Sequence, residues 1–278
     1  MRRILVPTDF SENSWKAIKY GVELLKDRCT FYLLHVNPLS SFSEANDPIT
    51  VGARLLDETL VHENKRCMDR LIKRIKTLPG IDRHTIMPLI ETDYLVDGIK
   101  REVQDKHIDL ILMGTKGASS QKKMALGSNT GAVITRVKCP LLAIPENAVY
   151  QQLREIAFPT DFQIAYDIRV LDDLIKMVTT HNAFLRILHI SKKGEVLSVE
   201  QQRNKDLLHD YVNHAPHSFH TLTSVRLEQA LQCFVESRNI DMVAMVAKNL
   251  NYFQRILFRP TVEEISYHTD VPFLVLHE

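Results

Sequence analysis

The chain has 278 residues, of which 45% are hydrophobic and 25% charged, and its formal net charge is +1. This length suits two domains of about 100–150 residues, and the charge provides no overall field for nucleic acid or an acidic membrane. Cys29, Cys67, Cys139 and Cys233 form no C-x-x-C pair, which predicts reduced, buried thiols and excludes a disulfide framework. No signal-peptide core or membrane-length apolar run is present. We therefore expect a cytoplasmic protein with no nucleic-acid or membrane partner.

The first half alternates short apolar runs with stretches of helical periodicity. The apolar runs predict strands over residues 4–7, 31–36, 86–90, 109–113 and 141–144. Helical spacing predicts one helix from Trp15 to Leu25, with Ser11 as its N-cap. Further helices are expected over 56–75, around 95–103 and from about 128 to 137. Apolar strands separated by helices predict a parallel sheet covered on both faces.

The second half repeats this scheme. Pro-Thr-Asp-Phe follows an apolar run at 7–10 and again at 159–162, and Asp109 has a counterpart 132 positions later in Asp241. Strands are expected over 156–159, 184–190, 221–225, 241–246 and 273–276. The sequence therefore predicts an α/β protein with two tandem doubly wound, five-stranded parallel-sheet domains of Rossmann-like type. We place these domains at residues 1–147 and 153–278, with the boundary in the polar segment 145–153.

A glycine-rich segment follows the fourth predicted strand. Residues 113–131, MGTKGASSQKKMALGSNTG, hold four of the nine glycines. In open parallel sheets ligands lie outside the carboxyl ends of the strands, where the strand order reverses. If the first and fourth strands are neighbours, Asp9 and this segment face each other there. The helix that opens at Gly127 and Ser128 would point backbone N–H groups into the same space, which suits a phosphate.

Three motifs carry a family resemblance. Gly114, Gly117, Gly127 and Ser128 fit the pattern G-x2-G-x9-G-(S/T), and P-T-D-F-S at 7–11 and L-L-H-V at 33–36 precede it. With these motifs in this order, the chain resembles a tandem universal stress protein over nearly its whole length. The glycine pattern resembles that of members that bind ATP. The resemblance implies ATP, with or without Mg²⁺, as the ligand of a stress or signalling switch with weak or no hydrolysis.

The resemblance also implies roles for the matching positions. Asp9 would contact the adenosine end of the nucleotide beside Pro7 and Thr8, and Val36 would meet the adenine edge. Met113 and Gly114 would lie against the ribose, and Gly117 would let the chain approach the phosphates. Gly127, Ser128 and Asn129 would hold phosphate oxygens. The resemblance implies no catalytic residue and no protein ligand for a metal.

The second half departs from the glycine pattern. At the same offset of 132 it has Val246, Asn249, Arg259 and Pro260. Val246 cannot easily adopt a positive φ, and Pro260 has no N–H for a phosphate. Asp161 survives and is expected to cap a turn or the following helix. We therefore predict that the second domain does not bind ATP in this manner and serves as a structural or regulatory partner.

The arrangement of the two domains leaves two other functions open. The resemblance implies that the strands at 141–144 and 273–276 pair edge to edge, so that the domains pack as an intramolecular pseudo-dimer. Whether two chains pair further as a homodimer is open. One alternative function is a pseudo-dimeric interaction scaffold without a nucleotide. The other is an adenylate-transferring enzyme, which is disfavoured because no SGGxDS-like phosphate loop is present.

The histidines have mainly structural interpretations. His35 and His189 are expected as half-buried, hydrogen-bonded side chains at strand ends. Four more histidines lie in 209–220. Their spacing admits a metal site, but the Ala-Pro sequence interrupts any continuous helical face. A solvated helix end is the favoured interpretation.

Overall fold

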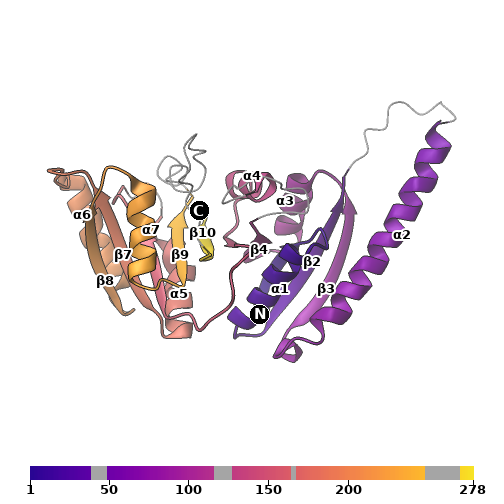
Figure 1. The fold of residues 1–278 in the computed structure, drawn as a ribbon, viewed down its shortest axis with the longest axis horizontal. Coiled ribbons are helices and arrows are strands. Elements are labelled where there is room, and N and C mark those ends of the chain that lie inside the picture. The colour runs from indigo at the N-terminus through magenta and orange to yellow at the C-terminus, as the bar shows by residue number, and fades with distance from the viewer. Residues whose placement is uncertain (39–48, 116–126, 164–166, 248–269) are drawn as a thin grey trace.

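Strands and helices alternate along most of the described chain (Figure 1). The computed structural model describes residues 1–38, 49–115, 127–163, 167–247 and 270–278, and for 49–61 only the helical backbone. The first half contains β1 (Arg2–Pro7), α1 (Glu12–Leu24), β2 (Cys29–Asn37), α2 (Ile49–Ile75), β3 (Thr85–Thr92), α3 (Leu95–Asp105), β4 (Leu110–Gly114), α4 (Ser128–Arg136) and β5 (Leu141–Ile144). The second half contains β6 (Glu155–Pro159), α5 (Asp172–His181), β7 (Phe184–Ser191), α6 (Val199–Val212), β8 (His217–Thr223), α7 (Leu227–Ser237), β9 (Met242–Val246) and β10 (Phe273–Leu276).

The strands form one sheet in the order β3-β2-β1-β4-β5-β10-β9-β6-β7-β8. Neighbouring strands are parallel except β5 and β10, which are antiparallel and place Leu142 opposite Leu274. In each half the first and fourth strands are neighbours, so the strand order reverses between β1 and β4 and between β6 and β9. The predicted doubly wound α/β fold is confirmed.

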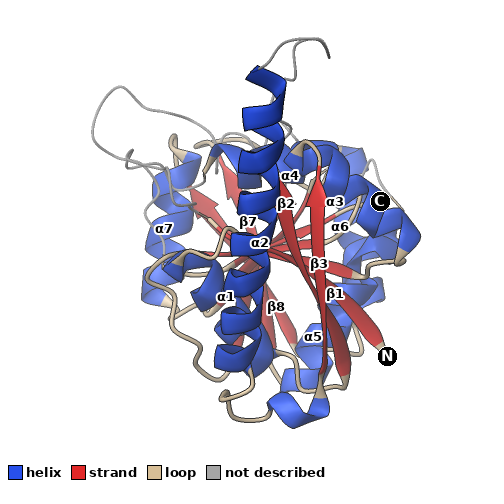
Figure 2. Ribbon diagram, turned by 90° about the vertical axis from the view of Figure 1, so that its right-hand side faces the viewer, coloured by secondary structure: helices blue, strands red, loops and turns tan. Residues whose placement is uncertain are grey.

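Helices cover both faces of this sheet (Figure 2). One apolar cluster lies under α1, α2, α5 and α6, and a second lies under α3, α4 and α7. Each cluster contains buried side chains from both halves, so burial of apolar surface stabilises the halves together. Ser11 caps α1 as predicted, because its side chain accepts from the backbone N–H of Ser14. No helix in the described ranges is long and apolar enough to cross a membrane.

The internal offset found in the sequence recurs in the backbone hydrogen bonds. The N–H of Asp109 donates to the Arg3 carbonyl at 2.9 Å, and its carboxylate accepts from the Arg3 N–H at 2.7 Å. In the second half Asp241 makes the same pair of bonds with Glu155, at 2.8 Å and 2.9 Å. These aspartates therefore join the start of the fourth strand to the first strand in each half.

The second-half histidine region differs from the prediction. The strand expected over 221–225 is β8, which spans His217–Thr223, and Val225 beyond it is 81% exposed. Helix α6 ends at Val212, so His217 and His220 lie on the strand and not on a helix end. β8 is an edge strand, so it can carry polar side chains that a central strand would have to bury. A prediction of strands from apolar runs therefore misplaced the bounds of β8.

The thiols also differ in part from the prediction. Cys29 and Cys139 are buried, whereas Cys67 is half-buried and Cys233 is exposed. Burial raises the pKa of the Cys139 thiol to about 12, so this thiol is inert at neutral pH. Cys67 and Cys233 lie on α2 and α7, and a helix has a solvent face on which a cysteine need not be buried.

Stability should depend on the protonation of His277. Burial, and then the ammonium of Lys138, lower the pKa of His277 from 6.5 to about 4, and its Nε2 is buried with no hydrogen-bond partner among the described residues. The unfolded chain therefore binds the proton more strongly, so stability present above pH 6.5 is lost as the pH falls towards 4. A pKa shift of this size lowers the free energy of unfolding by about 3 kcal/mol once His277 is fully protonated in both states.

Urea unfolding at pH 7 and pH 4.5 checks this expectation. Wild type should lose stability on acidification, and His277→Gln should lose about 2–3 kcal/mol less, because glutamine does not titrate. Burial also lowers the pKa of His84 and His181, so the variant should keep part of the pH dependence. Equal losses in wild type and variant would contradict the role of His277.

Candidate functional site

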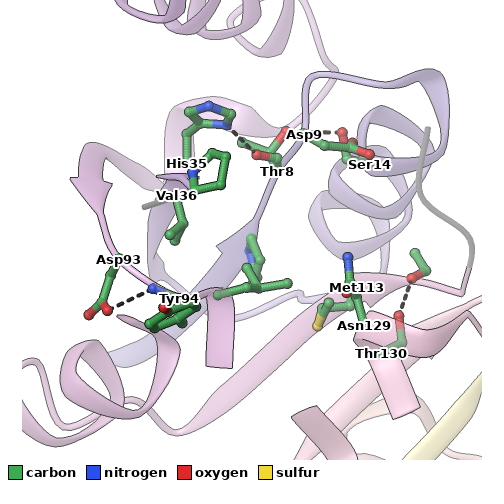
Figure 3. A pocket seen from close by; sticks show the side chains of 14 residues that line it. Thr8, Asp9, Ser14, His35, Val36, Asp93, Tyr94, Met113, Asn129 and Thr130 are labelled. Atoms are coloured by element: carbon green, nitrogen blue, oxygen red, sulfur yellow. Dashed lines mark hydrogen bonds between the residues drawn. The ribbon is translucent and has the colours of Figure 1, made fainter. Parts of the chain in front are cut away.

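A cavity of about 320 Å³ opens where the strand order of the first half reverses (Figure 3). It lies at the carboxyl ends of β1, β2 and β4 and at the N-terminal ends of α3 and α4. This is the position at which doubly wound sheets bind ligands, and the volume lies at the lower end of the range for small-molecule pockets. Its lining residues are Pro7, Thr8, Asp9, Ser14, His35, Val36, Pro38, Asp93, Tyr94, Leu95, Met113, Gly114, Asn129 and Thr130.

The turn after β1 forms one wall of the cavity. The Thr8 hydroxyl accepts from the Phe10 N–H at 3.1 Å, and Phe10 has a φ of 61°. Phe10 stacks on His35 with ring centroids 4.4 Å apart. The Nδ1 of His35 donates to the Thr8 carbonyl at 2.8 Å, which fixes the tautomer and leaves Nε2 as an acceptor. Asp9 is exposed at this turn, where one carboxylate oxygen accepts from the N–H and hydroxyl of Ser11 at 3.1 Å and 2.5 Å.

Helix α4 forms the opposite wall. Gly127 is its N-cap, and the Gly127 N–H donates to the Thr115 carbonyl at 2.5 Å. The hydroxyl of Thr130 donates to the Gly114 carbonyl at 2.9 Å and ties the helix to the end of β4. The first-turn N–H groups of an α-helix have no acceptor within the helix, and no acidic side chain stands in this first turn. This wall therefore favours an anion.

Gly114 lies where the backbone of α1 leaves little room for a side chain, and its φ is not positive. A Cβ at this position would lie 3.1 Å from the backbone carbonyl oxygen of Asn13. The glycines with positive φ in the described part of the chain are Gly80 and Gly194, and Gly127 has a φ of −70°. Of the two reasons for a glycine, a positive φ or a close approach, the first applies to neither Gly114 nor Gly127 and the second applies to Gly114. Gly114 allows α1 to pack closely against the end of β4.

The connection between β3 and α3, which contains Asp93 and Tyr94, forms the third wall of the cavity. Asp93 accepts from the Tyr94 N–H at 2.7 Å and from the Arg101 guanidinium at 2.7 Å, and Arg101 also pairs with Glu91. Burial, and then the neighbouring Glu91 carboxylate, raise the pKa of Glu102, which lies next to Arg101 on α3. Tyr94 is the N-cap of α3, and its ring is 66% exposed. This wall presents to the cavity the Asp93 carboxylate, which Arg101 pairs, and the Tyr94 ring, which suit an uncharged, flat group with hydrogen-bond donors.

The structure brings most of the predicted site residues together. Those that line the cavity are Pro7, Thr8, Asp9, Val36, Met113, Gly114 and Asn129. Gly127 and Ser128 lie at the start of α4 but are not among the lining residues. Gly117 lies outside the described residues. Their roles towards a nucleotide remain predictions.

Sequence reasoning missed part of the lining. The missed residues are Ser14, His35, Pro38, Asp93, Tyr94, Leu95 and Thr130. Asp93 and Tyr94 follow the carboxyl end of β3, and loops at this end of a parallel sheet converge. That rule, applied to the third predicted strand, would have found them.

The corresponding turn in the second half has the same scaffold. Phe162 has a φ of 58°, and it stacks on His189, whose Nδ1 donates to the Thr160 carbonyl at 3.0 Å. Gln201 and Asn204 of α6 donate to the carbonyls of Asp161 and Phe162, each at 2.8 Å. Pro-Thr-Asp-Phe is therefore a turn motif in both halves. In the second half, side chains of α6 donate hydrogen bonds to the carbonyl groups of this turn.

Val246 stands where the first half has Gly114. Val246 is 5% exposed, and Val246 pairs with Leu276 as Gly114 pairs with Ile144. Asn249, Arg259 and Pro260 lie outside the described residues. No group of three or more His, Cys, Asp or Glu side chains within the described ranges is arranged to hold a metal ion.

These features define a doubly wound α/β protein with a cavity at the reversal of its strand order. The Universal stress protein family model matches residues 1–145. Universal stress protein MJ0531 of Methanocaldococcus jannaschii is 27% identical over 145 residues, which cover 51% of this chain and 81% of that protein. Universal stress protein MJ0577 of the same organism is 27% identical over 157 residues, covering 51% and 94%. The chain belongs to the universal stress protein family.

The fold is also shared over the full length of a solved structure. A universal stress protein from Archaeoglobus fulgidus DSM 4304 aligns over 98% of this chain and 97% of its own, with a TM-score of 0.64. The two are 20% identical in sequence. At this identity the likeness concerns the fold alone.

Proposed function

We propose that the first domain, residues 1–147, binds ATP and that nucleotide occupancy acts as a stress or signalling switch with weak or no hydrolysis. The observation that carries the proposal is the cavity at the strand reversal, bounded by the first turn of α4. Backbone N–H groups and the helix dipole at that turn suit phosphate oxygens. The glycine spacing that resembles ATP-binding family members leads into the same turn.

The charges of the cavity walls favour one orientation of the nucleotide. Figure 3 shows Asp9 and Asp93 apart from Asn129 and Thr130 of α4, and phosphates placed beside these carboxylates would be repelled. The ribose and adenine instead offer hydroxyl and amino donors to carboxylates. We therefore place the adenosine between Asp9, Val36 and Tyr94 and the phosphates at Asn129 and the start of α4. Any Mg²⁺ would rely on phosphate oxygens and water, because the phosphates are placed at the start of α4 and not beside the two carboxylates.

The second domain, residues 153–278, is proposed as a partner that does not bind ATP. The Val246 side chain occupies the position of Gly114, and Gln201 and Asn204 use the carbonyls of the β6 turn. The antiparallel β5–β10 pair and the apolar clusters shared by both halves support an intramolecular pseudo-dimer. The same observation favours a second candidate function, a scaffold that carries no ligand.

Calorimetric titration of the full chain with ATP distinguishes the two candidates. We expect one ATP per chain, and adenine nucleotide should also be released when purified protein is extracted with acid. A stoichiometry near two would overturn the assignment of the second domain. An absence of binding at millimolar ATP would overturn the switch and favour the scaffold.

Asp9→Asn should weaken ATP binding about tenfold, because a hydrogen bond to a carboxylate is replaced by a weaker one to an amide. The asparagine oxygen can still accept from the Ser11 N–H, so the turn and the free energy of unfolding should change little. Asp161→Asn is the matched control, since Asp161 accepts from Gln163 at 3.0 Å in the corresponding turn. Calorimetry should show normal ATP binding in the control, and equal losses in both variants would contradict a contact at Asp9.

A further inference from the structure

A pair of histidines lies at the outer edge of the second half, on α6 and β8. The Nδ1 of His209 and the Nε2 of His217 are 3.1 Å apart. The Nδ1 of His217 is 2.9 Å from the Ala215 carbonyl oxygen, to which it donates. Its Nε2 therefore carries a lone pair that points towards His209. The edge strand β8 and β3 are at opposite ends of the sheet. The cavity proposed for ATP lies in the first half, so the histidine pair is separate from it.

We propose that His209 and His217 chelate one divalent transition-metal ion of the Cu²⁺, Ni²⁺ or Zn²⁺ type. Such metals bind imidazole nitrogen at about 2.0–2.1 Å. Two nitrogens at that distance are about 2.9 Å apart in square geometry and about 3.3 Å apart in tetrahedral geometry. The observed separation of 3.1 Å lies between these values, so the two nitrogens need not move apart, and each ring turns by about 40° to aim its lone pair at the ion.

The protonation of both rings suits this site. His209 is exposed, so its ring hydrogen can move from Nδ1 to Nε2, where water accepts it, and Nδ1 becomes a ligand. The Ala215 carbonyl already holds the outer nitrogen of His217, which is the usual support of a metal-bound histidine. Water completes the coordination. Mg²⁺ and Ca²⁺ should not bind, because both prefer oxygen ligands.

An ammonium group lies against the same aromatic ring as the histidine pair. The Lys205 ammonium lies 5.7 Å from the centre of the Phe219 ring, and that ring is 5.8 Å from each of the two imidazoles. Its positive charge opposes a bound metal ion. Lys205→Gln should therefore raise the metal affinity, by about threefold given the exposure of the site.

Calorimetric titration of the nucleotide-free full chain with Ni²⁺ tests the proposal. Wild type should bind one ion per chain, and His209→Gln and His217→Gln should each weaken binding at least about tenfold, because each leaves a single ligand. His214→Gln is the matched control, an exposed histidine in the connection between α6 and β8, and it should bind as wild type does. Lys205→Gln should bind more tightly.

Three results would overturn the proposal: wild-type affinity in both pair variants, an equal loss in His214→Gln, or one ion per two chains. Paramagnetic broadening of the His209 and His217 ring signals by Ni²⁺ in the wild-type protein requires no substitution, so it decides the matter even if a variant folds poorly. Because no nucleotide is present, the result is independent of ATP binding by the first domain.

Discussion

Gly114→Val should weaken ATP binding by about 10- to 100-fold, because overpacking costs about 1–3 kcal/mol at a close contact. The Cβ of any side chain at this position would lie 3.1 Å from the Asn13 carbonyl oxygen. A backbone atom cannot swing away as a flexible side chain can, so α1 and the end of β4 must separate by a few tenths of an ångström. That movement carries the turn with Asp9 away from the α4 wall and widens the cavity.

A graded series separates this effect from general damage. Gly114→Ala adds only the Cβ and should weaken ATP binding less than Gly114→Val, and circular dichroism should show that both variants are folded. Gly127→Arg added to Gly114→Val copies two positions of the second half and should reduce binding further. Val246→Gly is the reciprocal control and should leave the stoichiometry at one ATP per chain. Wild-type affinity in Gly114→Val would contradict the proposed site.

Periodicity predicted the central part of the fold well, for a physical reason. Strands in the middle of a parallel sheet are buried on both faces, so they are continuous apolar runs that are easily recognised. The structure gives β5 and β10 the same bounds as the predicted strands, 141–144 and 273–276. Edge strands lack this signal. β8 carries histidines, serine and threonines, and its start was therefore placed four residues too late.

The residues of the candidate site could be predicted from the sequence where a recognisable motif lies at the end of a predicted strand. Thr8 and Asp9 follow the end of β1, Gly114 is the last residue of β4, and all three line the cavity. Asp93 and Tyr94 belong to no recognised motif, and they come to the cavity only because β3, β2 and β1 are adjacent in the sheet. Gly114 was singled out as a position that needs either a positive φ or a close approach, and the structure shows the close approach. Its requirement is a close approach to the Asn13 carbonyl, and a sequence does not show which backbone lies opposite.

Leu274→Asp should lower the free energy of unfolding by about 3–5 kcal/mol, since an ionised carboxylate would be buried without a partner. Leu274 is 1% exposed on β10, directly opposite Leu142 of β5, where the two halves meet. Its side chain belongs to the apolar cluster that contains residues of both halves. A carboxylate there therefore disrupts the strand pair and the shared core together. The urea midpoint measured at pH 7 checks the size of the loss.

Leu207→Asp is the matched control, because Leu207 is a leucine on α6 that is 47% exposed. It should change the urea midpoint little, since water solvates the new charge. If the β5–β10 pair holds the halves together, Leu274→Asp should also expose the unpaired edges of both strands. Such edges favour association between chains, so light scattering should detect dimers or larger species in this variant and not in the control. A monomeric Leu274→Asp protein with a wild-type urea midpoint would show that the junction contributes little to stability.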